Sequence, residues 1–165
     1  MEGLFKKGIG FRSYIFNLDE NTKHDIMKYY IPINVNDEIR KQVNGIDKTI
    51  KVIGVVDPLC DNCKSNLPML EKIISTNPRI ELRLVIEKVL GNELDDYKID
   101  GILKLPIFLF MDETFKIIGS LSEELFTANG GSIKKIDSQG FLDKSEQDGF
   151  VEEMAEGILA IMSRE

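Results

Sequence analysis

The sequence has little of what many binding proteins and metal proteins rely on. Its 165 residues include no tryptophan, one histidine and only two cysteines. Basic residues form no cluster longer than an adjacent pair, and the net charge of -7 argues against electrostatic binding of nucleic acid. The longest apolar runs, such as 52–56 and 106–111, are too short to span a bilayer. We therefore expect neither a nucleic-acid partner nor a membrane partner.

Two further absences bear on location and on metal binding. The segment from Met1 to Lys7 lacks the long apolar stretch of a signal peptide, so we expect a cytoplasmic protein. In a reducing compartment, a close cysteine pair is usually redox-active or metal-binding rather than structural. The single histidine, His24, stands alone in a segment with helical spacing, so we expect no metal site.

The pattern of apolar residues divides the chain into two parts. Residues 1–47 are expected to form a helical extension, and residues 48–165 an α/β domain on which the extension packs. Within the extension, helical spacing covers 17–30 and ends at Pro32, and Asn36 is expected to start a second helix.

After residue 48 the apolar pattern predicts alternating strands and helices. Residues 52–56 are almost continuously apolar, as in a strand buried on both faces. Residues 80–85 alternate apolar and charged, and the helical pattern before them should make these two strands parallel. Further predicted elements are a short helix at 91–97, a hairpin of 106–111 and 115–118, a loop at 127–140 and a closing helix at 151–162. The expected fold class is α/β, with a mixed central sheet flanked by helices.

Both cysteines lie in one tetrapeptide, Cys60-Asp61-Asn62-Cys63, where the first strand gives way to a helix. The thiolate is the reactive form of cysteine, and the free N–H groups at a helix start favour it. Cys60 is therefore the expected nucleophile. Cys63, about one helical turn later, is the expected resolving thiol.

The charged neighbours of the pair are expected to tune it in opposing directions. Asp61 and the nearby Asp57 disfavour a thiolate, whereas Lys64 supplies a compensating positive charge. Asn62 completes the pair of residues between the cysteines. From the residues alone, two alternatives stay open: a chance pair of buried cysteines, and a zinc site shared between two chains.

Three features resemble the thioredoxin superfamily over residues 48–121. Cys60 to Lys64 is similar to the family's Cys-Gly-Pro-Cys-Lys. Pro68 stands where the family commonly has a proline in the active-site helix, and Leu105-Pro106 stands where it has an apolar residue before a cis-proline. The helical extension is more narrowly similar to a bacterial group of thioredoxin-like proteins.

This resemblance implies a three-layer thioredoxin-like fold and a thiol–disulfide oxidoreductase. Its catalytic residues would be Cys60 and Cys63, and Leu59, Leu105 and Pro106 would contact the substrate. The substrate would be a protein disulfide or a small thiol, and a reductase would donate electrons. No cofactor and no metal are implied.

Two departures from the family pattern matter. Leu59 replaces the tryptophan that usually precedes the first cysteine, and Gly54 replaces a buried acid that assists the second cysteine. These departures favour a competing interpretation, in which the chain is a non-catalytic module that holds a partner in the same groove.

Overall fold

The computed structural model describes residues 1–122 and 144–163. A four-stranded sheet with the order β2-β1-β3-β4 forms its centre. The strands are β1 (Ile50–Val56), β2 (Ile80–Ile86), β3 (Ile107–Met111) and β4 (Ile117–Ser122). β1 pairs in parallel with β2, whereas β3 runs antiparallel to both β1 and β4. The predicted mixed sheet and its parallel first pair are therefore confirmed.

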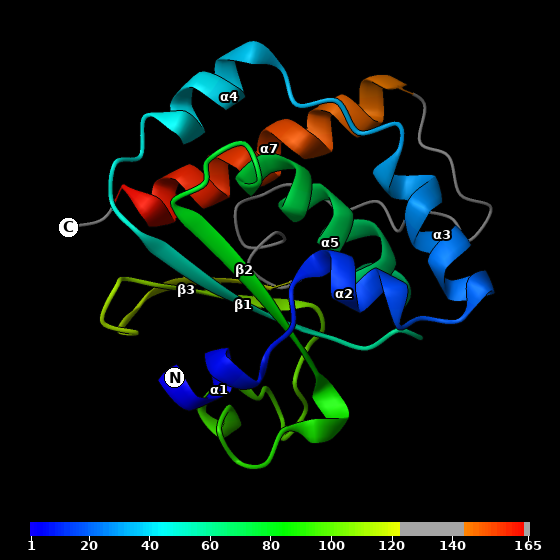
Figure 1. The fold of residues 1–165 in the computed structure, drawn as a ribbon, viewed down its shortest axis with the longest axis vertical. Coiled ribbons are helices and arrows are strands. Elements are labelled where there is room, and N and C mark those ends of the chain that lie inside the picture. The colour runs from blue at the N-terminus through cyan, green and yellow to red at the C-terminus, as the bar shows by residue number, and fades with distance from the viewer. Residues whose placement is uncertain (123–143, 164–165) are drawn as a thin grey trace.

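Helices cover both faces of the sheet (Figure 1). On one face, α5 (Asp61–Ile74) and α7 (Lys144–Met162) pack with α2 (Phe11–Phe16), α3 (Glu20–Tyr30) and α4 (Asp37–Asn44). On the other face, α1 (Glu2–Lys7) and the connection between β2 and β3 bury a second apolar cluster. The arrangement is the expected three-layer α/β fold.

The first half of the extension attaches to the edge of the sheet. Ile9 forms an isolated antiparallel bridge with Leu84 of β2, with N···O distances of 3.0 and 2.7 Å. The backbone groups at this edge of β2 therefore find partners in the extension. The domain boundary at residues 47 and 48 itself remains a prediction.

Capping residues explain where the helices of the extension begin. α3 starts after Asp19, whose side chain accepts hydrogen bonds from the backbone N–H groups of Asn21 and Thr22. α4 starts after Asn36, whose side chain accepts from the N–H of Ile39 at 2.9 Å. The predicted helix start at Asn36 agrees with this cap.

Local predictions differ from the structure at several points. The helix expected at 17–30 begins only at Glu20, because Asp19 caps its start and Asn17 ends α2. No α-helix forms at 91–97; short 3-10 turns at Glu87–Val89 and Asp95–Tyr97 stand in that connection. β4 begins at Ile117 rather than at residue 115, because Phe115 has a positive φ of 65° and belongs to the turn. The closing helix begins at Lys144, seven residues before the predicted 151. The predicted loop at 127–140 lies outside the described residues.

Candidate active site

Cys60 caps the start of α5, at the end of the loop that follows β1. Asp57 shapes this loop: its side chain accepts from the N–H of Leu59 at 2.8 Å, and its carbonyl accepts from the N–H of Cys60 at 3.0 Å. Asp57 therefore acts mainly as a turn residue. The sequence alone indicates only that Asp57 places a negative charge near the thiols.

The sulfur of Cys60 has two backbone partners. Its Sγ accepts from the N–H of Cys63 at 3.3 Å, and the thiol donates to the carbonyl of Leu105 at 3.7 Å. Cys60 is half-buried, whereas Cys63 has only 2% of its surface exposed. Both thiols are free, so the structure corresponds to the dithiol form. The accessible sulfur is the one predicted to be the nucleophile.

The two thiols differ strongly in pKa. Hydrogen bonding from the Cys63 thiol is the largest effect that lowers the pKa of Cys60, to about 7, with help from the N–H groups of Cys63 and Asn62. Partial burial and the charge of Asp57 oppose this shift. The same thiol–thiol hydrogen bond, together with burial, raises the pKa of Cys63 far above its ordinary value. At neutral pH the pair therefore holds one proton that Cys63 retains and one that Cys60 readily loses.

The chain segment before β3 forms the wall opposite Cys60. The Leu105–Pro106 peptide bond is cis. Ile107, which follows it, pairs with Val55 of β1, and this pairing places the Leu105 carbonyl against Cys60. Leu59, which directly precedes Cys60 in the chain, is 74% exposed. The structure thus brings Leu105 of the expected contact residues against Cys60, while the substrate-contact role of Leu59, Leu105 and Pro106 stays a prediction.

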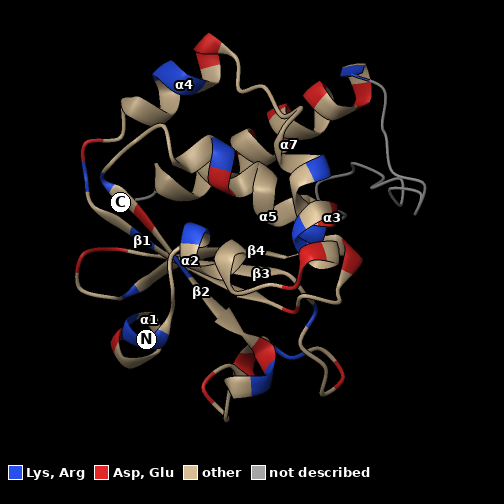
Figure 2. Cartoon of the chain, turned by 45° about the vertical axis from the view of Figure 1, so that its right-hand side comes forward, with Lys and Arg blue, Asp and Glu red and all other residues tan. Residues whose placement is uncertain are grey.

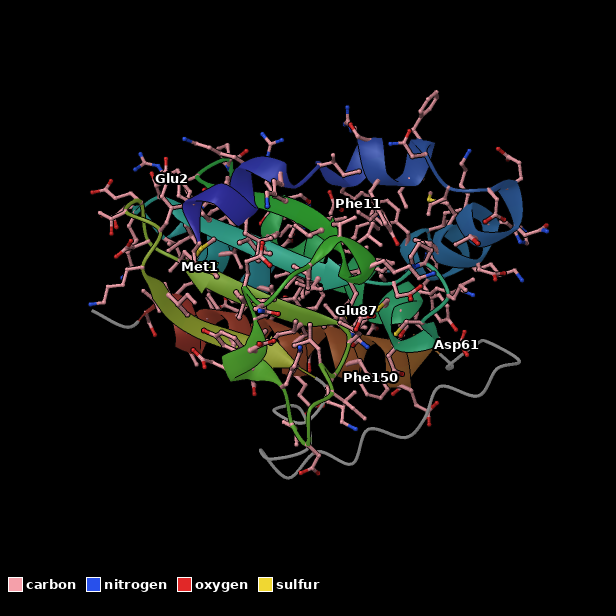
Figure 3. All side chains as sticks on the ribbon, turned by 90° about the horizontal axis from the view of Figure 1, so that it is seen from below. Met1, Glu2, Phe11, Asp61, Glu87 and Phe150 are labelled. Carbon is pink, nitrogen blue, oxygen red and sulfur yellow. The ribbon has the colours of Figure 1, made fainter. Side chains whose placement is uncertain are left out.

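Lys64 is directed toward the extension. Its Nζ lies 3.3 Å from Asp25 of α3 and 3.6 Å from Asp61, and only 16% of its side chain is exposed. Asp61 is itself 87% exposed and points away from the buried side of α5. Figure 3 labels Asp61 at the start of α5. The sequence could not have shown the role of Asp25, because it lies 39 positions from its partner.

Gly54 leaves no room for the buried acid that the resemblance would place there. A Cβ at this position would lie 2.8 Å from Cδ2 of Leu84 and 3.1 Å from Cδ1 of Phe108. A residue that sequence reasoning did not single out, Tyr14 of α2, is buried near the dithiol. Burial and the charges of Cys63, Asp57 and Cys60 raise its pKa.

The described part of the chain has neither a cluster of metal ligands nor a membrane-spanning helix. Within 1–122 and 144–163, no three histidine, cysteine, aspartate or glutamate side chains are grouped as metal ligands. In the same residues, no helix has the length and apolar character needed to cross a membrane.

Comparison with known proteins identifies the family. A family model described as thioredoxin matches residues 8–124. No curated protein matches. A protein of unknown function, PA1234 from Pseudomonas aeruginosa, has a similar structure, with a TM-score of 0.74 and 18% identity over 96% of this chain and 94% of its own. An HIV epitope-scaffold has a TM-score of 0.74 and 19% identity over 98% and 96% of the two chains. These identities show a shared fold, and the family match shows that this chain belongs to the thioredoxin family.

Proposed function

We propose that this protein is a thiol–disulfide oxidoreductase whose reactive pair is Cys60 and Cys63. The observation that carries the proposal is the asymmetry of the two thiols. Cys60 is half-buried with a pKa lowered to about 7, whereas Cys63 is buried with a raised pKa. A nucleophile with a pKa near ambient pH is close to optimal for exchange, because it combines a high thiolate fraction with good nucleophilicity.

The proposed cycle begins at the accessible sulfur. The Cys60 thiolate attacks one sulfur of a substrate disulfide, which forms a mixed disulfide and releases the other substrate sulfur as a thiolate. Cys63 then loses its proton and attacks Sγ of Cys60. The second substrate thiol leaves, and a Cys60–Cys63 disulfide remains. A reductase or a small thiol returns two electrons and two protons to restore the dithiol, and a cytoplasmic location would suit that reducing step.

Substrate contacts in this proposal come from three residues near Cys60 in the chain or in space. Leu59 offers exposed apolar surface, and the backbone at Leu105 and Pro106 lies directly across from the nucleophile. An extended segment of a substrate protein could lie between them with its disulfide over Cys60. The remaining neighbours, Asp57 and Lys64, shape the loop and anchor the helix rather than contact the substrate.

A disulfide-reduction assay tests the proposal. With dithiothreitol as the electron source and a model protein disulfide as substrate, the wild type should exceed the uncatalysed rate, and Cys60→Ser should abolish the excess. Cys63→Ser should instead accumulate the mixed disulfide at Cys60, visible by mass spectrometry. Ser75→Ala, at the far end of α5, is the matched control and should retain wild-type turnover. Absence of turnover in the wild type would contradict the proposal.

The competing function is a non-catalytic module that binds a partner in the same groove. The observation in its favour is Gly54, because no acid at that position can help Cys63 lose its proton. This alternative predicts no turnover and partner binding that survives Cys60→Ser.

A further inference from the structure

A pocket of about 650 Å³ lies between α2, α3 and α5, toward the end of α5 opposite Cys60. This volume falls in the range of ~300–1,000 Å³ that is usual for sites of small molecules. With a rise of ~1.5 Å per residue, Glu71 in the pocket wall lies roughly 16 Å along the helix from Cys60. The pocket is therefore separate from the candidate active site. Its apolar and aromatic walls come from Phe11, Ile15, Phe16, Met27 and Tyr30.

Contacts within the chain already hold part of the aromatic wall in place. The rings of Phe11 and Tyr30 stack with a centroid separation of 5.4 Å, and Nζ of Lys72 lies 4.3 Å from the centroid of Tyr30. Phe16, in contrast, is 81% exposed although it lines the pocket. A planar ring that enters the pocket would therefore gain aromatic and apolar contacts against walls that need little rearrangement.

Glu71 supplies this pocket with a hydrogen-bond acceptor that lacks a donor. Among residues 1–122 and 144–163, its Oε2 is a buried oxygen without a hydrogen-bond partner. Burial raises the pKa of Glu71, and the hydrogen bond from Tyr30 and the charges of Lys72 and Arg12 only partly offset this effect. Buried acceptors are usually satisfied, and an unpaired one calls for a partner. Because Glu71 lines the pocket and the terminal torsion of glutamate is broad, this oxygen can turn toward an N–H donor inside the pocket.

An available positive charge stands at the same pocket. Arg12 of α2 lines the pocket and is exposed, and its charge acts on both Glu71 and Tyr30. In the part of the chain that the structure describes, Arg12 forms no ion pair, whereas Lys23 is already held by Glu20 at 2.8 Å. Figure 2 shows both basic and acidic segments on α3, the helix that carries this pair. Arg12 can therefore bind an acidic group of a ligand, since guanidinium and carboxylate match in geometry as well as in charge.

We propose that this pocket binds a small aromatic acid that carries an N–H donor on its ring system. The ring lies against the apolar wall, its N–H donates to Glu71, and its carboxylate pairs with Arg12. Each part of the ligand thus meets a group that the folded chain leaves without a partner. A plain hydrocarbon would leave Glu71 unpaired and an amine would be repelled by Arg12, so neither should bind well. Because the pocket lies away from Cys60, this binding does not depend on the proposed redox function.

Indole-3-acetate is a probe of this chemistry, and its own fluorescence reports on binding because the chain contains no tryptophan. Titration with the full chain should change the indole emission and saturate, with a dissociation constant below ~1 mM. Two related probes separate the groups of the ligand. 1-Methylindole-3-acetate lacks the N–H, and tryptamine carries an ammonium group in place of the acid. Each should bind at least about tenfold more weakly than indole-3-acetate.

Variants connect each preference to one residue. Arg12→Gln should remove the preference for indole-3-acetate over tryptamine, and Glu71→Leu the preference over the N-methyl probe. Lys88→Gln, an exposed cation outside the pocket, is the matched control and should keep the wild-type affinities. A circular dichroism spectrum checks that the variants fold, and Ser75→Trp, which fills the pocket from an exposed position, replaces Glu71→Leu if needed and should abolish binding. Absence of saturable binding to the wild type, equal affinity for the three probes, or preferences that persist in the variants would overturn the proposal.

Discussion

The clearest quantitative prediction concerns the hydrogen bond between the two thiols. Replacement of Cys63 by alanine removes the donor that most lowers the pKa of Cys60, but keeps the backbone N–H of residue 63 at 3.3 Å from the sulfur. A hydrogen bond to a charged group contributes about 1.5–3 kcal/mol, and one pKa unit corresponds to about 1.4 kcal/mol. Because Cys60 is only half-buried, the lower end applies, and its pKa should rise by roughly one unit.

The rate of iodoacetamide alkylation as a function of pH measures this pKa directly, because only the thiolate reacts. For the wild type, the rate should rise with pH through a midpoint of about 7, and mass spectrometry should find one adduct, on Cys60. The midpoint of Cys63→Ala should lie about one unit higher.

Cys63→Ser is the control for this measurement, because its hydroxyl can still donate and its midpoint should remain close to the wild-type value. If Cys63→Ala and the wild type titrate together, the thiol–thiol hydrogen bond does not set the pKa of Cys60. The proposed role of Cys63 in making Cys60 the more acidic thiol would then be wrong.

Three predictions concern stability, each measured by urea unfolding of the reduced protein. Gly54→Ala should lower the free energy of unfolding by about 1–3 kcal/mol, because its Cβ would lie 2.8 Å from Cδ2 of Leu84; an unchanged value would show that the site has space. Gly149 is exposed within α7, and a Cβ added there would have no atom within 4 Å. Gly149→Ala should therefore raise the free energy of unfolding by about 0.5–1 kcal/mol, and a decrease in that free energy would contradict the open surroundings. The buried side-chain amide of Asn77 donates to the backbone carbonyl groups of Val43, in α4, and Ile46, just after it, at 2.8 and 2.9 Å. Asn77→Ala should therefore lower the free energy of unfolding by at least about 2 kcal/mol, and a negligible change would contradict this role.

Local sequence patterns were sufficient for several parts of the fold. The apolar run of β1 and the alternation of β2 predicted these strands and their parallel pairing, because side-chain periodicity directly reflects which faces are buried. The pattern at 91–97 failed because that segment is short and forms only 3-10 turns. A segment of this length gives few periodic positions, so local pattern cannot separate a helix from a turn.

The candidate site likewise has features that local sequence predicts and features that it does not. The position of Cys60 at a helix start, with Cys63 one turn later, could be predicted from adjacent residues, because a helix fixes the geometry of its own first turn. The pairing of Lys64 with Asp25 could not be predicted, because α3 packs on α5 only in the folded chain. The same holds for Tyr14, which reaches the vicinity of the thiols from α2.

The sequence by itself determined the Cys60–Cys63 pair, the first turn of α5 that holds it, and the strands β1 and β2 before and after that helix. All of these features depend on residues that are neighbours along the backbone. Only folding decided that the Leu105 carbonyl lies 3.7 Å from the Cys60 sulfur, 45 positions away, because that contact depends on the antiparallel pairing of β3 with β1. Folding also decided that Gly54 has no space for a side chain, because the neighbouring strands bring Leu84 and Phe108 against it. Contacts between distant segments depend on how whole elements pack, and no local pattern encodes that packing.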